Sequence, residues 1–144
     1  MAAEAYRFTL NLQRTNRKGH EGFRTLMPFE TKNGGTMFTE NKTVSPTDIG
    51  GGVTRKILSY SNNLMTVELI FPKGATGAKH SHPHEQIGYI VSGSLVYQEE
   101  GQEDKVLCTG DTYYVAPNVV HGVEILEDTK LLDIFTPMRE DFVK

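Results

Sequence analysis

The sequence predicts an all-β domain, a sandwich or barrel of short strands, and three observations support this fold class. From Thr54 onward, β-branched and aromatic residues form short runs at close spacing. Glycine, proline and asparagine separate the runs and supply turn chemistry. No segment shows the spacing of an amphipathic helix. So many short turns imply that neighbouring strands are antiparallel.

Each predicted strand is bounded by such signals, and alternation supports the assignment. Met65, Val67 and Leu69 share one face of a strand while Thr66 and Glu68 share the other, so one face belongs to the core. In chain order, the predicted strands and the turns that end them are Arg55–Tyr60 before Asn62-Asn63, Leu64–Phe71 before Pro72-Lys73-Gly74, Ala78–His82, Gln86–Val91 before Ser92-Gly93, Ser94–Glu99 before the tip at Gly101, Lys105–Cys108 before Gly110-Asp111, Thr112–Val115 before Pro117-Asn118, His121–Leu126 and Lys130–Phe135.

The first fifty residues have a different pattern, in which loop-forming Asn33-Gly34-Gly35 and Gly50-Gly51-Gly52 surround short candidate strands at Tyr6–Leu12 and Thr36–Glu40. We assign residues 1–50 to an N-terminal extension and residues 51–144 to the β domain. Edge strands from an extension cover an open sheet in the same chain or in a partner subunit, because unpaired edges invite aggregation. A homodimer is the expected assembly.

Composition limits the classes of function. A chain of 144 residues with 38% hydrophobic content suits one core. With 15 basic and 18 acidic side chains the net charge is −3, so no broad cationic face is available for nucleic acid. The single cysteine, Cys108, fits a reducing compartment, and no apolar run has the length of a membrane span. We expect a cytoplasmic protein without a nucleic-acid or membrane partner.

Three of the five histidines lie within five residues, which indicates a metal site. His80 and His82 are two residues apart, so on a strand both imidazoles point to the same side. Imidazole suits zinc, copper, iron and nickel. Gln86 can join them after a turn, and His121 can supply a fourth donor from a distant strand, although a histidine among inward apolar residues is by itself more often a satisfied core residue. His84 has the same parity, but Pro83 favours a bend at that point, so His84 is interpreted as a pocket-rim or solvated loop residue.

Two motifs in these segments resemble those of the cupin superfamily. The first motif, a glycine, His-x-His, a later acidic residue and a second glycine, matches Gly74, His80, His82 and Gly93, with Gln86 in the place of the usual glutamate. The second motif, a glycine-led strand followed by a proline and a histidine, matches Gly110, Pro117 and His121. The resemblance implies a double-stranded jelly-roll barrel. It also implies one divalent metal ion on His80, His82, Gln86 and His121.

Glutamine in place of glutamate bears on the chemistry. Three imidazoles and an amide leave the charge of a divalent ion uncompensated, so an anionic small molecule would be attracted. Such a centre favours Lewis-acid chemistry, whether the metal is Ni, Zn, Mn or Fe(II), although oxygen activation stays open. The alternative is a tolerated ligand change without consequence.

The C-terminal segment supplies the other candidates. Asp133 and Phe135 share one face of the last strand, and a carboxylate there is either bonded structurally or moves a proton. The run His-Pro-His-Glu-Gln-Ile, with the tail Leu-Asp-Ile-Phe-Thr-Pro-x-Arg-Glu-Asp-Phe, resembles the pectin-degradation-protein branch of small cupins. That resemblance implies that Asp133 and Arg139 line the pocket with Phe135 as its aromatic residue.

The function implied by this branch is the ring opening and ketonisation of 4,5-unsaturated monouronates from pectin or alginate. In this mechanism Asp133 moves the proton and Arg139 orients the substrate carboxylate. Two alternatives use the same barrel: a dioxygenase or lyase acting on a small organic acid, and a non-catalytic barrel that binds a small molecule.

Overall fold

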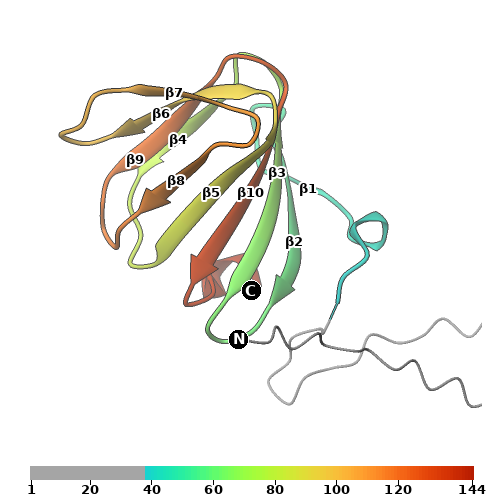
Figure 1. Ribbon diagram of the computed structural model, residues 1–144. Helices are drawn as coiled ribbons and strands as arrows, with labels where there is room; N and C mark the ends of the chain where they lie inside the picture. Colours follow the sequence, from blue (N-terminus) through green and yellow to red (C-terminus); the bar gives the residue numbers. More distant parts are fainter. Residues whose placement is uncertain (1–37) are drawn as a thin grey trace, which may run out of the picture.

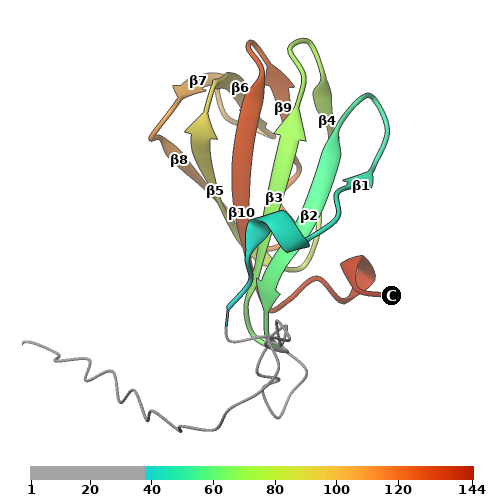
Figure 2. The ribbon, with the colours of Figure 1, turned by 90° about the vertical axis from the view of Figure 1, so that its right-hand side faces the viewer.

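The computed structural model describes residues 38–144, and all ten strands of this part lie in two antiparallel sheets that face each other (Figures 1 and 2). One sheet has six strands in the order β1-β2-β3-β10-β5-β8, and the other has four in the order β4-β9-β6-β7. The strand bounds are β1 Thr47–Asp48, β2 Thr54–Tyr60, β3 Met65–Phe71, β4 Thr76–His80, β5 Glu85–Ser92, β6 Ser94–Glu99, β7 Lys105–Cys108, β8 Thr112–Val115, β9 His121–Ile125 and β10 Thr129–Thr136.

Strand β10 lies in the middle of the larger sheet, between β3 and β5, although it is the last strand of the chain. It alternates between buried and partly buried residues, so Leu131, Asp133 and Phe135 point to the inside, as their parity predicts. The jelly-roll arrangement therefore brings the C-terminal strand beside the first half of the domain. The cupin fold predicted from the two motifs is confirmed.

The interior between the sheets is filled by apolar side chains in two clusters. The larger cluster contains Ile90, Leu95 and Val115, and it spans both sheets. The smaller one contains Met65, Val67 and Phe135 and lies towards the C-terminal tail, where Met138 and Phe142 pack against it. After β10, that tail forms a short 3₁₀ turn over Glu140–Phe142.

All nine strands expected between residues 55 and 135 are present, but one boundary is wrong at the histidine cluster. The predicted strand ran to His82, whereas β4 ends at His80 and His82 follows it in a loop. His80 pairs with His121 in the last register of β4 and β9. The His82 carbonyl instead accepts a hydrogen bond of 2.7 Å from the Asn118 amide, and Pro83 follows directly, so the ladder cannot continue.

The described part of the predicted extension contributes a short edge strand. β1 pairs with β2 through Thr47 and Arg55, and a 3₁₀ turn over Asn41–Thr43 precedes it. The candidate strand Thr36–Glu40 forms no strand over residues 38–40, and the Thr39 hydroxyl lies 3.0 Å from the Leu58 carbonyl. The candidate strand Tyr6–Leu12 lies outside the described residues. The division at residue 50 stays a prediction.

The outer face of the six-stranded sheet carries several exposed apolar side chains. Exposed apolar side chains on it come from β3, β5 and β8: Ile70, Ile87, Tyr89, Val91 and Tyr114. The homodimer expected from the edge-covering extension stays a prediction. In residues 38–144, no helix combines the length and hydropathy needed to cross a membrane.

Candidate metal centre and cavity

Three histidines from two segments of the chain meet at the end of the β4–β9 pair. His80 is the last residue of β4, His82 lies in the following loop, and His121 begins β9. One ring nitrogen from each lies within 4.8 Å of the others, and His82 and His121 are buried. This spacing is what a tripod of imidazole ligands requires. The cluster is a candidate metal site.

Each of the three rings is oriented by a backbone carbonyl. The Nδ1 atoms of His80, His82 and His121 lie 2.8, 3.1 and 3.0 Å from the carbonyl oxygens of Ala78, His84 and Val119. A carbonyl can only accept, so each Nδ1 carries the proton and each Nε2 keeps a lone pair. Metal-ligating histidines in proteins are typically held in this way.

The remaining nitrogen atoms support the same interpretation. His121 Nε2 is buried and has no hydrogen-bond partner among the described residues. Burial is also the largest cause of a lowered pKa for both His82 and His121, so both rings are kept in the neutral form that binds metal ions. A metal ion would satisfy the orphaned lone pair.

Gln86 completes the cluster from β5. Its amide nitrogen lies 3.5 Å from the Tyr113 hydroxyl, and its Oε1 lies 2.9 Å from His82 Nε2. Because Nδ1 of His82 already donates to a carbonyl, two electron-rich atoms face each other at this point. A cation bound by both atoms would remove the conflict. The donor set predicted from the sequence therefore fits a divalent metal ion.

Asp133 lies beside this donor set, fully enclosed on β10. The Tyr113 hydroxyl donates to Asp133 Oδ1 at 3.2 Å. Burial raises the pKa of Asp133 to about 7, against the lowering effects of hydrogen bonds from Gln86 and Tyr113 and of the charge on Arg139. Burial also raises the pKa of Tyr113 well above its usual value, with a further contribution from Asp133. Near neutral pH the carboxyl group can hold or release a proton.

Tyr113 was given no role by the sequence, yet it links Gln86 to Asp133 and stacks on Tyr97 with ring centroids 4.5 Å apart. Its ring occupies the space above Gly88 on β5. A Cβ atom at Gly88 would lie 2.1 Å from the ring carbon Cζ of Tyr113. Only a residue without a side chain fits there.

Gly88→Ala should therefore destabilise the fold by about 1–3 kcal/mol, because the buried ring cannot move aside without repacking. Denaturant unfolding measures this change. In a Tyr113→Val background the obstructing ring is absent, so the same alanine should cost clearly less. An equal cost in both backgrounds would show that the overlap with Tyr113 is not the cause.

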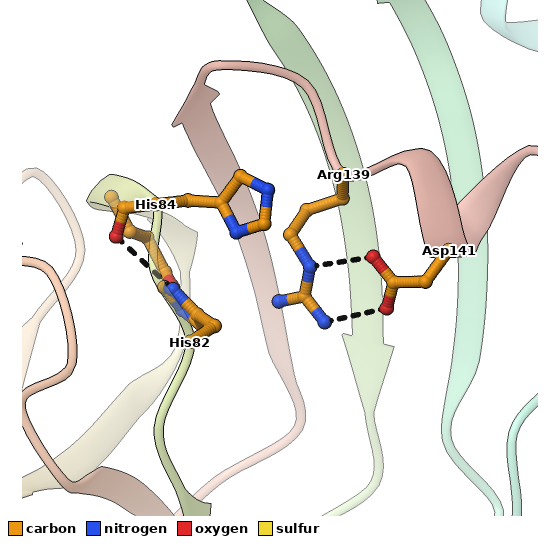
Figure 3. Close-up of polar contacts among 5 residues, drawn as sticks. His82, His84, Arg139 and Asp141 are labelled. Carbon is orange, nitrogen blue, oxygen red and sulfur yellow. Dashed lines mark hydrogen bonds and ion pairs between the residues drawn. The ribbon is translucent and has the colours of Figure 1, made fainter.

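Arg139, predicted to line the pocket and orient a substrate carboxylate, bonds to a neighbouring carboxylate of the tail in the structure. Its Nε and one terminal nitrogen donate to the two carboxylate oxygens of Asp141 at 3.0 and 2.8 Å (Figure 3). This pairing is the first cause of a pKa of about 2 for Asp141. The guanidinium also lies 4.3 Å from the centre of the Phe142 ring and 5.5 Å from that of Phe135. The other terminal nitrogen points towards the histidine loop in Figure 3.

The remaining predicted residues take the following places. Phe135 is 3% exposed and meets the His82 ring edge-on, with centroids 5.6 Å apart. The His84 ring lies between the His82 loop and Arg139 (Figure 3), and His84 does not belong to the three-histidine cluster. Its backbone carbonyl nevertheless orients His82.

A cavity of about 580 Å³, a size typical of small-molecule sites, lies beside these groups. Its wall contains His80, His121, Gln86, Asp133, Phe135 and Arg139, together with Arg55 and Phe142, which sequence reasoning missed. Arg55 belongs to no motif. The only sequence signal of its inward position is the alternation of residues along β2.

Comparison with known proteins places the chain in a family. The pectin degradation protein KdgF of Dickeya dadantii (strain 3937) is 44% identical over 98 residues, which cover 67% of this chain and 88% of that protein. The chain belongs to the KdgF family of cupins. The cupin domain model matches residues 67–135, which include Gln86, His121 and Asp133.

Solved structures agree with membership of the KdgF family. KdgF from Halomonas sp. is 36% identical with a TM-score of 0.70, and the match covers 73% of this chain and 98% of that one. An RmlC-like cupin from Shewanella frigidimarina NCIMB 400 is 40% identical with a TM-score of 0.71, covering 74% and 95%. The resemblance to this branch predicted from the sequence is confirmed.

Proposed function

We propose that the protein opens and ketonises 4,5-unsaturated monouronates released from pectin or alginate. The observation that carries this proposal is the convergence of His80 and His121 of the three-histidine cluster, Asp133 and Arg139 on one cavity. A relative named as a pectin degradation protein adds support for uronate chemistry. The substrate is a small anion whose ring opening yields an enol that must become a ketone.

The proposed site would hold one divalent ion on His80, His82, Gln86 and His121. All four donors are neutral, so the ion keeps its full charge for the substrate. The ion would supply Lewis-acid stabilisation of negative charge at the reacting oxygen. Ni, Zn, Mn and Fe(II) are all compatible with imidazole and amide donors.

Asp133 moves the proton in this proposal. Ketonisation removes a proton from the enol oxygen and adds one to the far carbon of the enol double bond, and a carboxyl group whose pKa lies near 7 suits both halves of that transfer. Tyr113 holds Oδ1 at 3.2 Å, which fixes the carboxyl group relative to Gln86.

Phe135 and Arg139 position the substrate. The Phe135 ring packs against His82 and provides an apolar wall that excludes water beside the reacting atoms. Arg139 contributes positive charge while Asp141 holds two of its nitrogens. Its remaining nitrogen can donate one hydrogen bond to an oxygen of the sugar acid.

The direct test is an assay of the purified protein loaded with each divalent metal in turn. An unsaturated monouronate, prepared with a polysaccharide lyase, loses its ultraviolet absorbance as it opens, and the spontaneous rate is subtracted. We expect acceleration with at least one metal and no oxygen uptake. Oxygen consumption with turnover would support the dioxygenase instead, and no acceleration with any metal would refute the proposal.

A further inference from the structure

Arg55 projects into the cavity from β2, and strand register shows this. Arg55 pairs with Leu69 of β3, and paired residues on antiparallel strands point to the same face. Leu69 packs against both core clusters, so Arg55 faces inward. The next residue, Lys56, pairs with Glu68 and points to the outer face, where its ammonium bonds to Asn41.

Two arginines share one aromatic ring at this end of the cavity. The Arg55 guanidinium carbon lies 4.0 Å from the centre of the Phe142 ring, and that of Arg139 lies 4.3 Å from it. Such stacking holds the plane of a guanidinium while leaving its N–H groups free to donate. Phe142, which lies in the C-terminal tail, therefore orients both guanidinium groups.

The two arginines differ in what they bond. Asp141 occupies two nitrogens of Arg139. Within residues 38–144, the Arg55 guanidinium forms no hydrogen bond and no ion pair, although Arg55 is only partly exposed and its burial lowers its pKa. One carboxylate thus stands against two guanidinium groups: Arg139 keeps only part of its N–H donors for a ligand, whereas all those of the Arg55 guanidinium are free.

We propose that Arg55 binds the carboxylate of the substrate and makes the cavity selective for anionic sugar acids. The inference rests on the function proposed above and names a contact residue for it. A guanidinium matches a carboxylate with two parallel hydrogen bonds, and aromatic stacking reduces the freedom lost on binding. With the carboxylate held at the Phe142 end, the rest of the molecule extends along the cavity towards Asp133 and the histidine cluster.

The test measures equilibrium binding, so it does not depend on turnover. The probe is D-galacturonate, a saturated monouronate, titrated into the metal-loaded protein and compared with its uncharged methyl ester. Arg55→Gln keeps a long polar side chain but removes the charge, and Arg55→Lys keeps the charge but removes the fork. Lys56→Gln is the matched control, because it removes the same charge from the next residue on the opposite face.

Arg55→Gln should weaken galacturonate binding about 10–100-fold and leave binding of the methyl ester nearly unchanged, since one charged hydrogen-bonding partner is lost. The galacturonate affinity of Arg55→Lys should lie between those of the wild type and Arg55→Gln. If Arg55→Gln does not fold, Arg55→Lys is the variant that tests the inference. Lys56→Gln should change binding by less than about twofold, as expected for a screened surface charge.

Three results would overturn the inference. The first is unchanged galacturonate binding in Arg55→Gln, or none in the wild type. The second is an equal loss for the acid and the ester, which would mean a packing role. The third is an equal loss in Lys56→Gln, which would mean a general effect of charge. Failure of the ring-opening assay alone would refute the reaction and leave this binding result standing.

Discussion

Replacing His121 with alanine should remove the metal ion and, with it, catalysis above the spontaneous rate. His121 is 3% exposed and presents an unpaired Nε2 to the cluster, so its loss leaves two imidazoles and one amide. Loss of one of four donors weakens metal binding, so dialysis against a chelator should remove the ion from the variant. Elemental analysis should find close to one ion per chain in the wild type and far less in the variant.

The matched control is His84→Ala, which removes a histidine from the same short segment. The His84 ring contributes no donor to the cluster, and the carbonyl that orients His82 belongs to the backbone, so it survives the substitution. We expect this variant to keep its ion. Full metal retention in His121→Ala, or equal loss in both variants, would show that the ligand set is wrong.

Asp133→Asn should lower the turnover number by about a hundredfold to ten-thousandfold, the usual contribution of general acid–base catalysis. Asparagine keeps the volume of the side chain and can still bond to Tyr113, so the site should stay folded. It lacks the group that titrates, and it lies outside the donor set. Activity should therefore fall while metal content and unfolding temperature stay close to those of the wild type.

Glu68→Gln is the control for this experiment, because Glu68 is also a buried carboxylate on a strand next to β10. It is 8% exposed, and it pairs with Lys130 at 3.4 Å instead of lining the cavity. Its amide variant should retain wild-type turnover. If Asp133→Asn also retains it, Asp133 is structural and the proton comes from another group.

The sequence predicted the strands well because local patterns determine them. Alternation along residues 65–69 and 131–135 places the correct residues inside, and glycine or proline marks most ends. The error at His82 has a long-range cause. A hydrogen bond from Asn118, distant in sequence, ends the ladder at β4, and no periodicity records such a partner.

By itself, the sequence determined the fold class, the family motifs and the residue types of the candidate centre, since spacing and parity are properties of the chain. Only the tertiary structure decided which groups share one space. Arg55 meets Phe142 and Arg139 because β2 lies two strands from β10 in the same sheet and the C-terminal tail crosses below them. The occupied fork of Arg139 follows from the turn that brings Asp141 beside it. Charge and burial depend on three-dimensional neighbours, and strand patterns carry no record of those.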